Sequence, residues 1–416
     1  MFFSQHCASA ERIYLQKTIC NISLLYQVLS NTVVLNNERM ISQERSQEQF
    51  AQMVGERVAL ARKEAGLTQA ELSKRLGFKD RQILSNIESG KRKVSSDELL
   101  KLMESLGREL RFFTDPLRLA GEGAFSWRAP QAEAELLDEF EERAGEWVAT
   151  YRFFCRISGE RFSPITPQLA LTAKSSFEDA QLAAEALVVE WELGRQPILE
   201  LRRKVEEELG VLVLSIAAPS GISGAACQLP QFNTILINRN EPEGRRNFDF
   251  AHELFHVLTW DRLPPRRIDG VPATKYKDKR VENLADNFAG ALLMPRDSLA
   301  REWKIREELE IHDRLNDIAG VFFVTSVAVK WRCRALDLLC DADLVGIDDG
   351  RLTWNGRTNG EQRVPSLFSE SFVRRLQWAL DNGALSVRRA ARILGLSIYE
   401  MRQLIEEYDL PVPFDL

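Results

Sequence analysis

Two histidines four residues apart, with a glutamate directly after the first, constrain this chain more than any other feature. They form the stretch His252-Glu253-Leu254-Phe255-His256, and the whole chain has only 4 histidines. Residues four apart stack on one face of a helix, so two imidazoles in this register can bind one metal ion. Glu253 leans to the side of that face, where it can take a proton from a water molecule that the metal activates.

The apolar surroundings of this motif favour a metal site over an ordinary amphipathic helix. Phe248, Ala251, Phe255 and Leu258 flank the histidines, which predicts a half-buried helix. Burying two imidazoles and a carboxylate without partners is costly. The alternative is a structural helix whose histidines are satisfied by hydrogen bonds in the core.

A catalytic zinc ion generally has three protein ligands, so this site needs a third. Glu282 is the best candidate, because it begins an apolar helix in which Ala285 and Ala289 would let two helices approach closely. Asp286 is the alternative on the same helix, and His312 lies in a charged stretch that is expected to be exposed. Glu282 could instead serve only as an acid that favours the helix dipole.

Composition excludes several classes of protein. The net charge of −6 excludes a polybasic nucleic-acid coat, so any nucleic-acid binding must come from a local patch. The 6 cysteines are scattered without a CxxC pair, which fits a reducing compartment rather than a disulfide framework. We find neither a signal peptide nor an apolar run near the ~18–20 residues of a membrane span. A cytoplasmic protein that does not enter membranes is therefore expected.

Glycine and proline residues and changes in composition divide the chain into several parts. Its 416 residues exceed the roughly 100–200 residues of a typical domain. We expect a poorly defined extension over 1–47 with Met40 as the biological start, a helical domain over 48–115, a linker over 116–135, a metal-binding domain over 136–345 with its core at 190–335, and a helical region over 346–416.

Three separated motifs resemble the ImmA/IrrE family of zinc metallopeptidases. They are GISGAACQ, TILINRNEPEGRRNFDFAHELFHVL and VENLADNFAGALLMP, in this order, and the resemblance covers 190–335. It implies that Zn²⁺ is held by His252, His256 and Glu282 and that Glu253 is the catalytic base. Proteases of this family inactivate repressors or antitoxin-like proteins by limited cleavage, so the resemblance implies a protein substrate of that kind.

One departure from the family leaves an alternative open. Family members usually have glycine where Phe255 stands, so a large ring near the metal would narrow substrate access. This favours a non-enzymatic transcription factor or antitoxin whose metal domain is a sensor or scaffold. Tyr276 and His312 are candidates for stabilising the oxyanion.

Residues 54–107 resemble the Cro/C1-type (Xre-family) helix-turn-helix domain. In such folds the second helix of the motif enters the major groove and its polar side chains contact base edges. The resemblance implies a double-stranded DNA operator, a homodimer and a transcriptional role, and a protein-binding helical bundle is the alternative. The DNA-binding candidates are Gln69, Arg81, Gln82, Ser85, Asn86, Lys91 and Arg92.

The predicted fold class is mainly α and multidomain. It comprises an N-terminal all-α helix-turn-helix domain of five helices, an α+β zincin-like domain with a small sheet, and a helical C-terminal tail. Short strands are expected at 211–214 and 234–238, and the segment 220–228 between them predicts a third strand or a turn. The arginine cluster of the tail, at Arg388, Arg389 and Arg392, is expected to be a solvated face or a partner surface.

Overall fold

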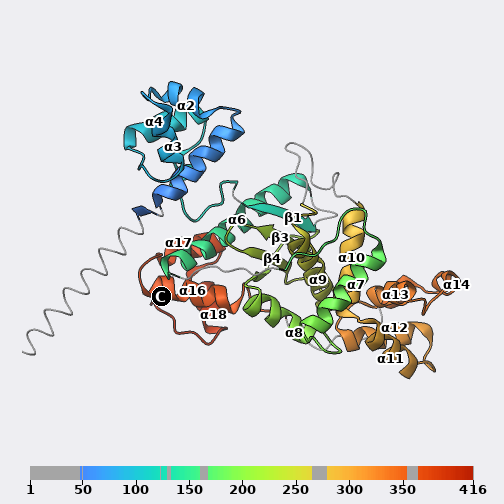
Figure 1. Cartoon of the computed structure of the whole chain (residues 1–416). Helices are drawn as coiled ribbons and strands as arrows, with labels where there is room; N and C mark the ends of the chain where they lie inside the picture. The colour runs from blue at the N-terminus through green and yellow to red at the C-terminus, as the bar shows by residue number, and fades with distance from the viewer. Residues whose placement is uncertain are drawn as a thin grey trace, which may run out of the picture. The chain divides into compact units, whose positions relative to one another are not determined.

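The computed structural model describes residues 47–48, 50–121, 123–128, 133–159, 167–264, 279–353 and 364–415. The chain separates into two compact units, Met1–Pro116 and Leu117–Leu416 (Figure 1). Met40, nearly all of the predicted extension and the oxyanion candidate Tyr276 lie outside the described residues.

The first unit is a helical bundle. Its described helices are residues 50–64, α2 (Gln69–Leu76), α3 (Arg81–Glu88), α4 (Ser96–Leu106) and α5 (Leu110–Thr114). Helix α2 begins at a capping box between Thr68 and Glu71 and ends at Gly77, whose φ of 74° is easily adopted only by glycine. Apolar side chains from all these helices, including Leu72, Leu84, Ile87, Leu102 and Phe113, form the core.

The second unit is built on a four-stranded sheet. Its strands are β1 (Ala124–Arg128), β2 (Leu212–Ile216), β3 (Gly224–Gln228) and β4 (Asn233–Asn238), in the order β1-β3-β4-β2. β3 pairs antiparallel with both β1 and β4, whereas β2 pairs parallel with β4. The two predicted strands are confirmed, and the segment between them forms β3 rather than a turn.

Strand β1 corrects the prediction of a linker over 116–135. Its sequence AFSWR lies between glycines and a proline, which made the segment resemble a loop. The strand forms because its backbone pairs with β3, from Ala124 opposite Gln228 to Arg128 opposite Gly224. The rings of Phe125 and Trp127 also stack, with their centroids 5.4 Å apart. Tertiary contacts thus override the local turn signals.

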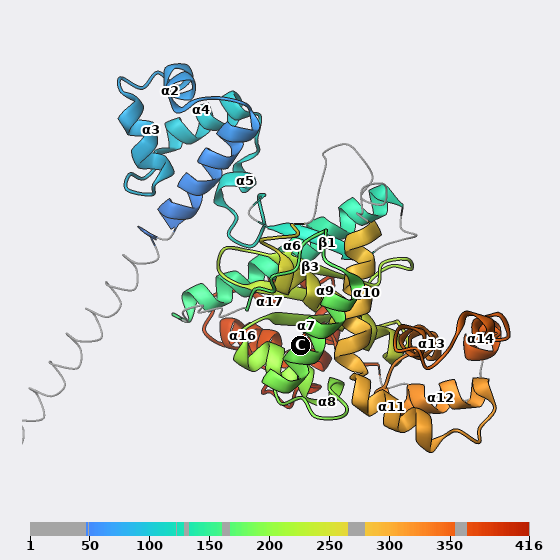
Figure 2. The same cartoon turned by 45° about the vertical axis from the view of Figure 1, so that its right-hand side comes forward.

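Helices cover both faces of the sheet, as Figure 2 shows. Leu214 and Leu236 point to one face, which packs on the helices α6 (Ala134–Ile157), α16 (Glu370–Asp381), α17 (Val387–Leu394) and α18 (Ile398–Glu406). Val213 and Ile235 point to the other face, which packs on α7 (Phe177–Glu190), α9 (Glu243–Thr259) and α10 (Lys279–Leu293). Burial on both faces explains why the strands read as continuous apolar runs.

Shorter helices complete the second unit. They are α8 (Ile198–Arg203), the π-helical turn η1 (Lys204–Glu208), α11 (Arg296–Ile305), α12 (Ile311–Phe322), α13 (Ser326–Ala335), α14 (Asp341–Val345) and α15 (Asp349–Thr353). Within the described residues, no helix is both long and apolar enough to cross a membrane. The predicted fold class is confirmed: a helical N-terminal domain, a small sheet within a mainly helical second domain, and a helical C-terminal region.

Candidate metal centre

Helix α9 places the two histidines and the glutamate of the motif inside the second unit. It packs on β3 and β4 with one side and on α10 with another. Every residue from Asp249 to Thr259 is buried, and His252 and Glu253 are fully so. Such a run of buried polar groups is tolerated only where partners or a ligand satisfy them.

The side chains of His252, His256 and Glu282 meet between α9 and α10. Their ligand atoms all lie within 4.8 Å of one another. The Nε2 atoms of the two histidines are 3.3 Å apart. The Glu282 carboxylate lies 3.4 Å from Nε2 of His252 and 3.7 Å from Nε2 of His256.

This arrangement fits a zinc ion. Ligand atoms bound at about 2.0–2.1 Å in a tetrahedron are separated by roughly 3.3–3.5 Å, which is close to the separations observed. Two imidazoles and one carboxylate are also the ligand set of one class of catalytic zinc site. The structure therefore brings together the three residues that the sequence analysis names as metal-ligand candidates. The third residue beside the two histidines is Glu282 rather than Asp286.

Glu253 lies on the side of α9 that packs against the sheet. Its Cγ atom would be 3.5 Å from a Cβ atom at Gly224 of β3, and the carbonyl oxygen of Leu236 would be only 2.8 Å from that Cβ. A side chain at Gly224 would therefore press on the backbone of the neighbouring strand β4, while its contact with Glu253 would be an ordinary van der Waals contact. Glycine lets β3 and β4 pair closely at the point where the Glu253 side chain lies against the sheet.

Charged groups also contact His252 on the Nδ1 side of its ring, opposite the Nε2 atom that faces Glu282. Nδ1 of His252 hydrogen-bonds the Asp286 carboxylate at 2.9 Å. The guanidinium of Arg128 lies 3.1 Å from the same carboxylate oxygen and 2.8 Å from Asp249. The sequence prediction missed the role of all three residues. Asp286 follows Glu282 by one helical turn and Asp249 precedes Glu253 by one, but nothing in the sequence links Arg128 to them.

These neighbours set the protonation of the site. Burial and Arg128 both lower the pKa of His252, but hydrogen bonds from Asp286 and Glu282 outweigh them and raise it above its usual value. Burial raises the pKa of Asp249, and the nearby Arg128 only partly offsets this. Burial also acts on Asp286, yet His252 and Arg128 bring the pKa of that carboxyl below its usual value.

Two other sequence expectations change in the structure. The Phe255 ring is fully buried, with its centroid 5.5 Å from that of Phe288 and 5.7 Å from that of His256. It packs in the core beside the metal centre. His312 is buried, so the expectation that it is exposed is wrong. Its ring hydrogen-bonds Glu310 and accepts from the backbone N–H of Asp348, and it is not among the grouped metal ligands.

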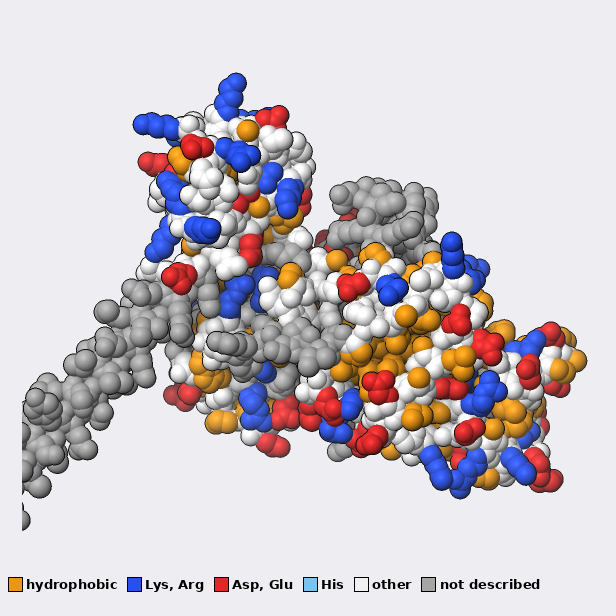
Figure 3. All heavy atoms as spheres, viewed as in Figure 1, with side chains coloured by type: hydrophobic (Ala, Val, Ile, Leu, Met, Phe, Trp, Pro, Cys, Tyr) orange, Lys and Arg blue, Asp and Glu red, His pale blue; other side chains and the backbone are white. Residues whose placement is uncertain are grey.

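The DNA-binding candidates lie on and around α3 of the first unit. Arg81, Gln82 and Lys91 are exposed, whereas the other four candidates are partly buried. Gln82 donates to Asn86 at 3.2 Å. Gln69 donates to Glu88, and Arg92 pairs with Glu98. Figure 3 shows that Lys and Arg side chains project from this unit, with acidic side chains between them.

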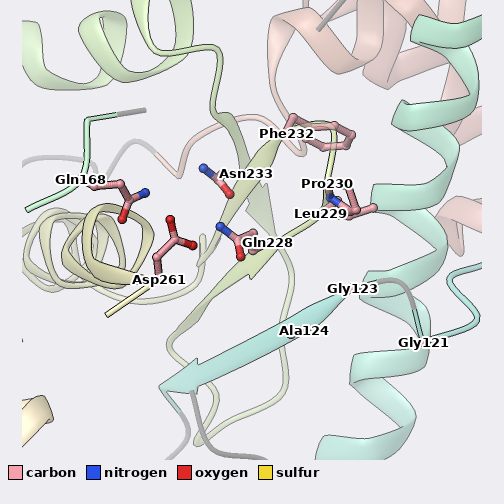
Figure 4. A pocket seen from close by; sticks show the side chains of 10 residues that line it. All are labelled: Gly121, Gly123, Ala124, Gln168, Gln228, Leu229, Pro230, Phe232, Asn233 and Asp261. Atoms are coloured by element: carbon pink, nitrogen blue, oxygen red, sulfur yellow. The ribbon is translucent and has the colours of Figure 1, made fainter. Parts of the chain in front are cut away.

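A polar pocket lies at the other end of the β1–β3 ladder. It has a volume of about 550 Å³ and is lined by Gln228, Asn233, Gln168 and Asp261, among others (Figure 4). Ala124 and Gln228 line it and lie opposite each other, four residues along each strand from the Arg128–Gly224 pair. That spacing corresponds to about 13 Å along the strand.

Two protein-family models match the segments that contain the two groups of candidate residues. The helix-turn-helix family model matches residues 58–113. The IrrE N-terminal-like domain model, of the Peptidase_M78 family, matches residues 206–334, which include all three grouped ligands. No curated protein and no solved structure matches the chain. The chain therefore joins an Xre-like helix-turn-helix domain to an ImmA/IrrE-like peptidase domain.

Proposed function

We propose that this protein is a DNA-binding transcriptional regulator whose second domain is a zinc-dependent endopeptidase acting on a repressor or antitoxin-like protein. The observation that carries the proposal is the convergence of His252, His256 and Glu282 within 4.8 Å, with Glu253 as the next residue on the same helix. We further propose that the helix-turn-helix domains pair as a homodimer on double-stranded DNA.

The residues of the site divide the chemistry between them. The histidines and Glu282 would hold the zinc ion, which supplies Lewis acidity and lowers the pKa of water. Glu253 would take the proton of the attacking water and later pass it to the leaving amine. Its complete burial keeps the carboxylate away from bulk solvent. Asp286 would hold the His252 ring so that Nε2 faces the ion.

Metal content and cleavage test this proposal together. Wild type, His252→Ala and Glu253→Gln are purified as full-length chains, and bound zinc is measured for each. Each is then incubated with candidate repressor and antitoxin-like proteins from its host. We expect one zinc per chain in wild type and in Glu253→Gln, none in His252→Ala, and cleavage by wild type alone.

The other outcomes identify the alternatives. Zinc binding by wild type without cleavage of any candidate would replace the peptidase by a metal-dependent sensor or scaffold. No zinc in any of the three proteins would make α9 a structural helix whose histidines are satisfied by neighbouring side chains such as Asp286 and Glu282.

A further inference from the structure

One arginine reaches the metal centre from outside the matched peptidase segment. Arg128 is the last residue of β1, whereas the family match begins at residue 206. Its Nε atom lies 2.8 Å from Asp249, and its Nη1 atom lies 3.1 Å from Asp286. The same Nη1 atom contacts Nδ1 of His252. One guanidinium thus touches two carboxylates and a metal ligand.

Arg128 can influence the metal site through Asp286. The Asp286 carboxylate lies 2.9 Å from Nδ1 of His252, and Nε2 of the same ring faces Glu282. When His252 carries its proton on Nδ1, Asp286 accepts that proton's hydrogen bond and Nε2 is the nitrogen that can bind a metal. Such carboxylate–histidine contacts orient the ring and raise its basicity, and their loss typically weakens metal binding by about 10–100-fold. The Asp286 side chain is 44% exposed, so without Arg128 little else would hold it against the ring.

We propose that Arg128 is a positioning residue of the metal centre: it clamps Asp286 and, through it, His252, so that metal affinity depends on strand β1. The inference deepens the proposed function and rests on it in one respect, that the three grouped residues bind zinc.

The placement of β1 makes this dependence specific. Arg128 lies opposite Gly224, and a Cβ atom at Gly224 would lie 3.5 Å from Cγ of Glu253. Trp127 anchors the strand from the other side, because its Nε1–H donates to Glu141 of α6 at 2.7 Å. The guanidinium is therefore held by a strand that begins only eight residues after the helix-turn-helix unit ends. A displacement of β1 would therefore change the contacts that Arg128 makes with Asp286 and His252.

A simpler view is that Arg128 only neutralises the buried Asp249. Removing a buried ion-pair partner is strongly destabilising, so an alanine at this position would confuse folding with metal binding. Lysine avoids this problem. A lysine ammonium can stay beside Asp249, but it lacks the fork by which arginine bonds two carboxylates at once.

The experiment measures zinc affinity by chelator competition on the full-length protein. The variants are Arg128→Lys, Asp286→Asn and the double variant, and the matched control is Arg245→Lys. Arg245 also lies near Asp249, with its Nε atom 3.7 Å from Oδ2, and it precedes Asp249 by one turn of α9. Cobalt absorption of each protein reports the coordination geometry independently of cleavage.

We expect each single variant to weaken zinc binding about tenfold or more and to change the cobalt spectrum, while Arg245→Lys matches wild type. If Arg128 acts through Asp286, the double variant binds zinc no more weakly than the weaker single variant. Additive losses, or wild-type affinity in either single variant, would overturn the inference. Should Arg128→Lys fail to fold, wild-type affinity in Asp286→Asn would still overturn it, and a tenfold loss there would support it.

The same data separate this inference from the proposed function. Zinc binding by wild type without any cleavage would overturn the proposed endopeptidase activity but not the role of Arg128. Cleavage by Arg128→Lys and Asp286→Asn at wild-type zinc affinity would support the endopeptidase activity and overturn the role of Arg128. Absence of zinc from wild type would overturn both.

Discussion

Helices α3 and α9 carry the two sets of candidate functional residues, and they place them in opposite environments. On α3 only Leu84 and Ile87 are buried, while Arg81 and Gln82 are exposed and Ser85 and Asn86 are partly buried. On α9 the polar residues of the motif are as buried as their apolar neighbours. A helix that reads DNA must expose its donors and acceptors to a partner that arrives later. A metal centre needs its groups fixed in advance and shielded from water. Substitutions of buried side chains should therefore act on stability in either region, and substitutions of the exposed residues on α3 should act on DNA binding.

The largest expected effect is on the stability of the second unit. Phe255→Ala removes a fully buried ring, and we expect a loss of about 4 kcal/mol in the free energy of unfolding. All 8 tryptophans lie after residue 116, so tryptophan fluorescence in urea follows this unit alone. Arg81→Ala, an exposed change on α3, is the control and should leave the fluorescence transition unchanged. Equal stability of Phe255→Ala and wild type would mean that the ring is not part of the core.

A slightly smaller effect is expected from the buried ion pair of the first unit. Glu88 lies 2.6 Å from Arg62, and both side chains are at most one tenth exposed. Glu88→Ala leaves the arginine unpaired, which should destabilise this unit by about 3 kcal/mol. Far-UV circular dichroism should show an earlier transition while tryptophan fluorescence stays as in wild type. A shift in both signals would show that the two units do not unfold independently.

Substitution of a residue that contacts DNA bases should change the free energy of DNA binding by less than a core substitution changes the free energy of unfolding. Gln82→Ala removes an exposed side chain of α3, and we expect a loss of about 2 kcal/mol in affinity for the operator. Affinity for unrelated DNA should stay the same. Operator and unrelated duplexes are compared by fluorescence anisotropy at one salt concentration. An equal loss on both duplexes would assign Gln82 to the phosphate backbone.

The smallest effect is expected from a single exposed cation. Lys91→Ala should weaken binding to all DNA sequences alike and reduce the slope of log K against log salt by about 0.9. Titrations at several salt concentrations measure the slope. An unchanged slope would place Lys91 away from the DNA.

The sequence predicts those parts of both regions that depend on local spacing. The capping box at Thr68 and Glu71, the strands at 211–214 and 234–238, and the ligand candidates on α9 and α10 all follow from patterns within one element. These patterns are informative because helix and strand periods fix which side chains share a face.

The sequence does not predict what depends on long-range pairing. AFSWR carries a strand alternation, but the glycines and proline around it favour a loop, and only β3 makes it a strand. The contact of Arg128 with His252 spans 124 residues and has no local signature. His312 looked exposed because its sequence neighbours are charged, yet the N–H of Asp348 satisfies its ring in the interior. Such tertiary partners are invisible to composition and period alone.

The helices on the sheet face opposite α9 set a limit on how this protein can be divided. Leu214 and Leu236 of the matched segment are covered by α6 and by the three C-terminal helices, and the outer edge of β2 is bridged by Phe368. A fragment cut to residues 206–334 would expose this apolar face together with two unpaired strand edges, which favours aggregation. We therefore expect that the peptidase-like segment does not fold as an isolated fragment. A fragment meant to fold alone must include the flanking helices and β1, and a recombinant protein that exchanges only the matched segment is expected to be insoluble.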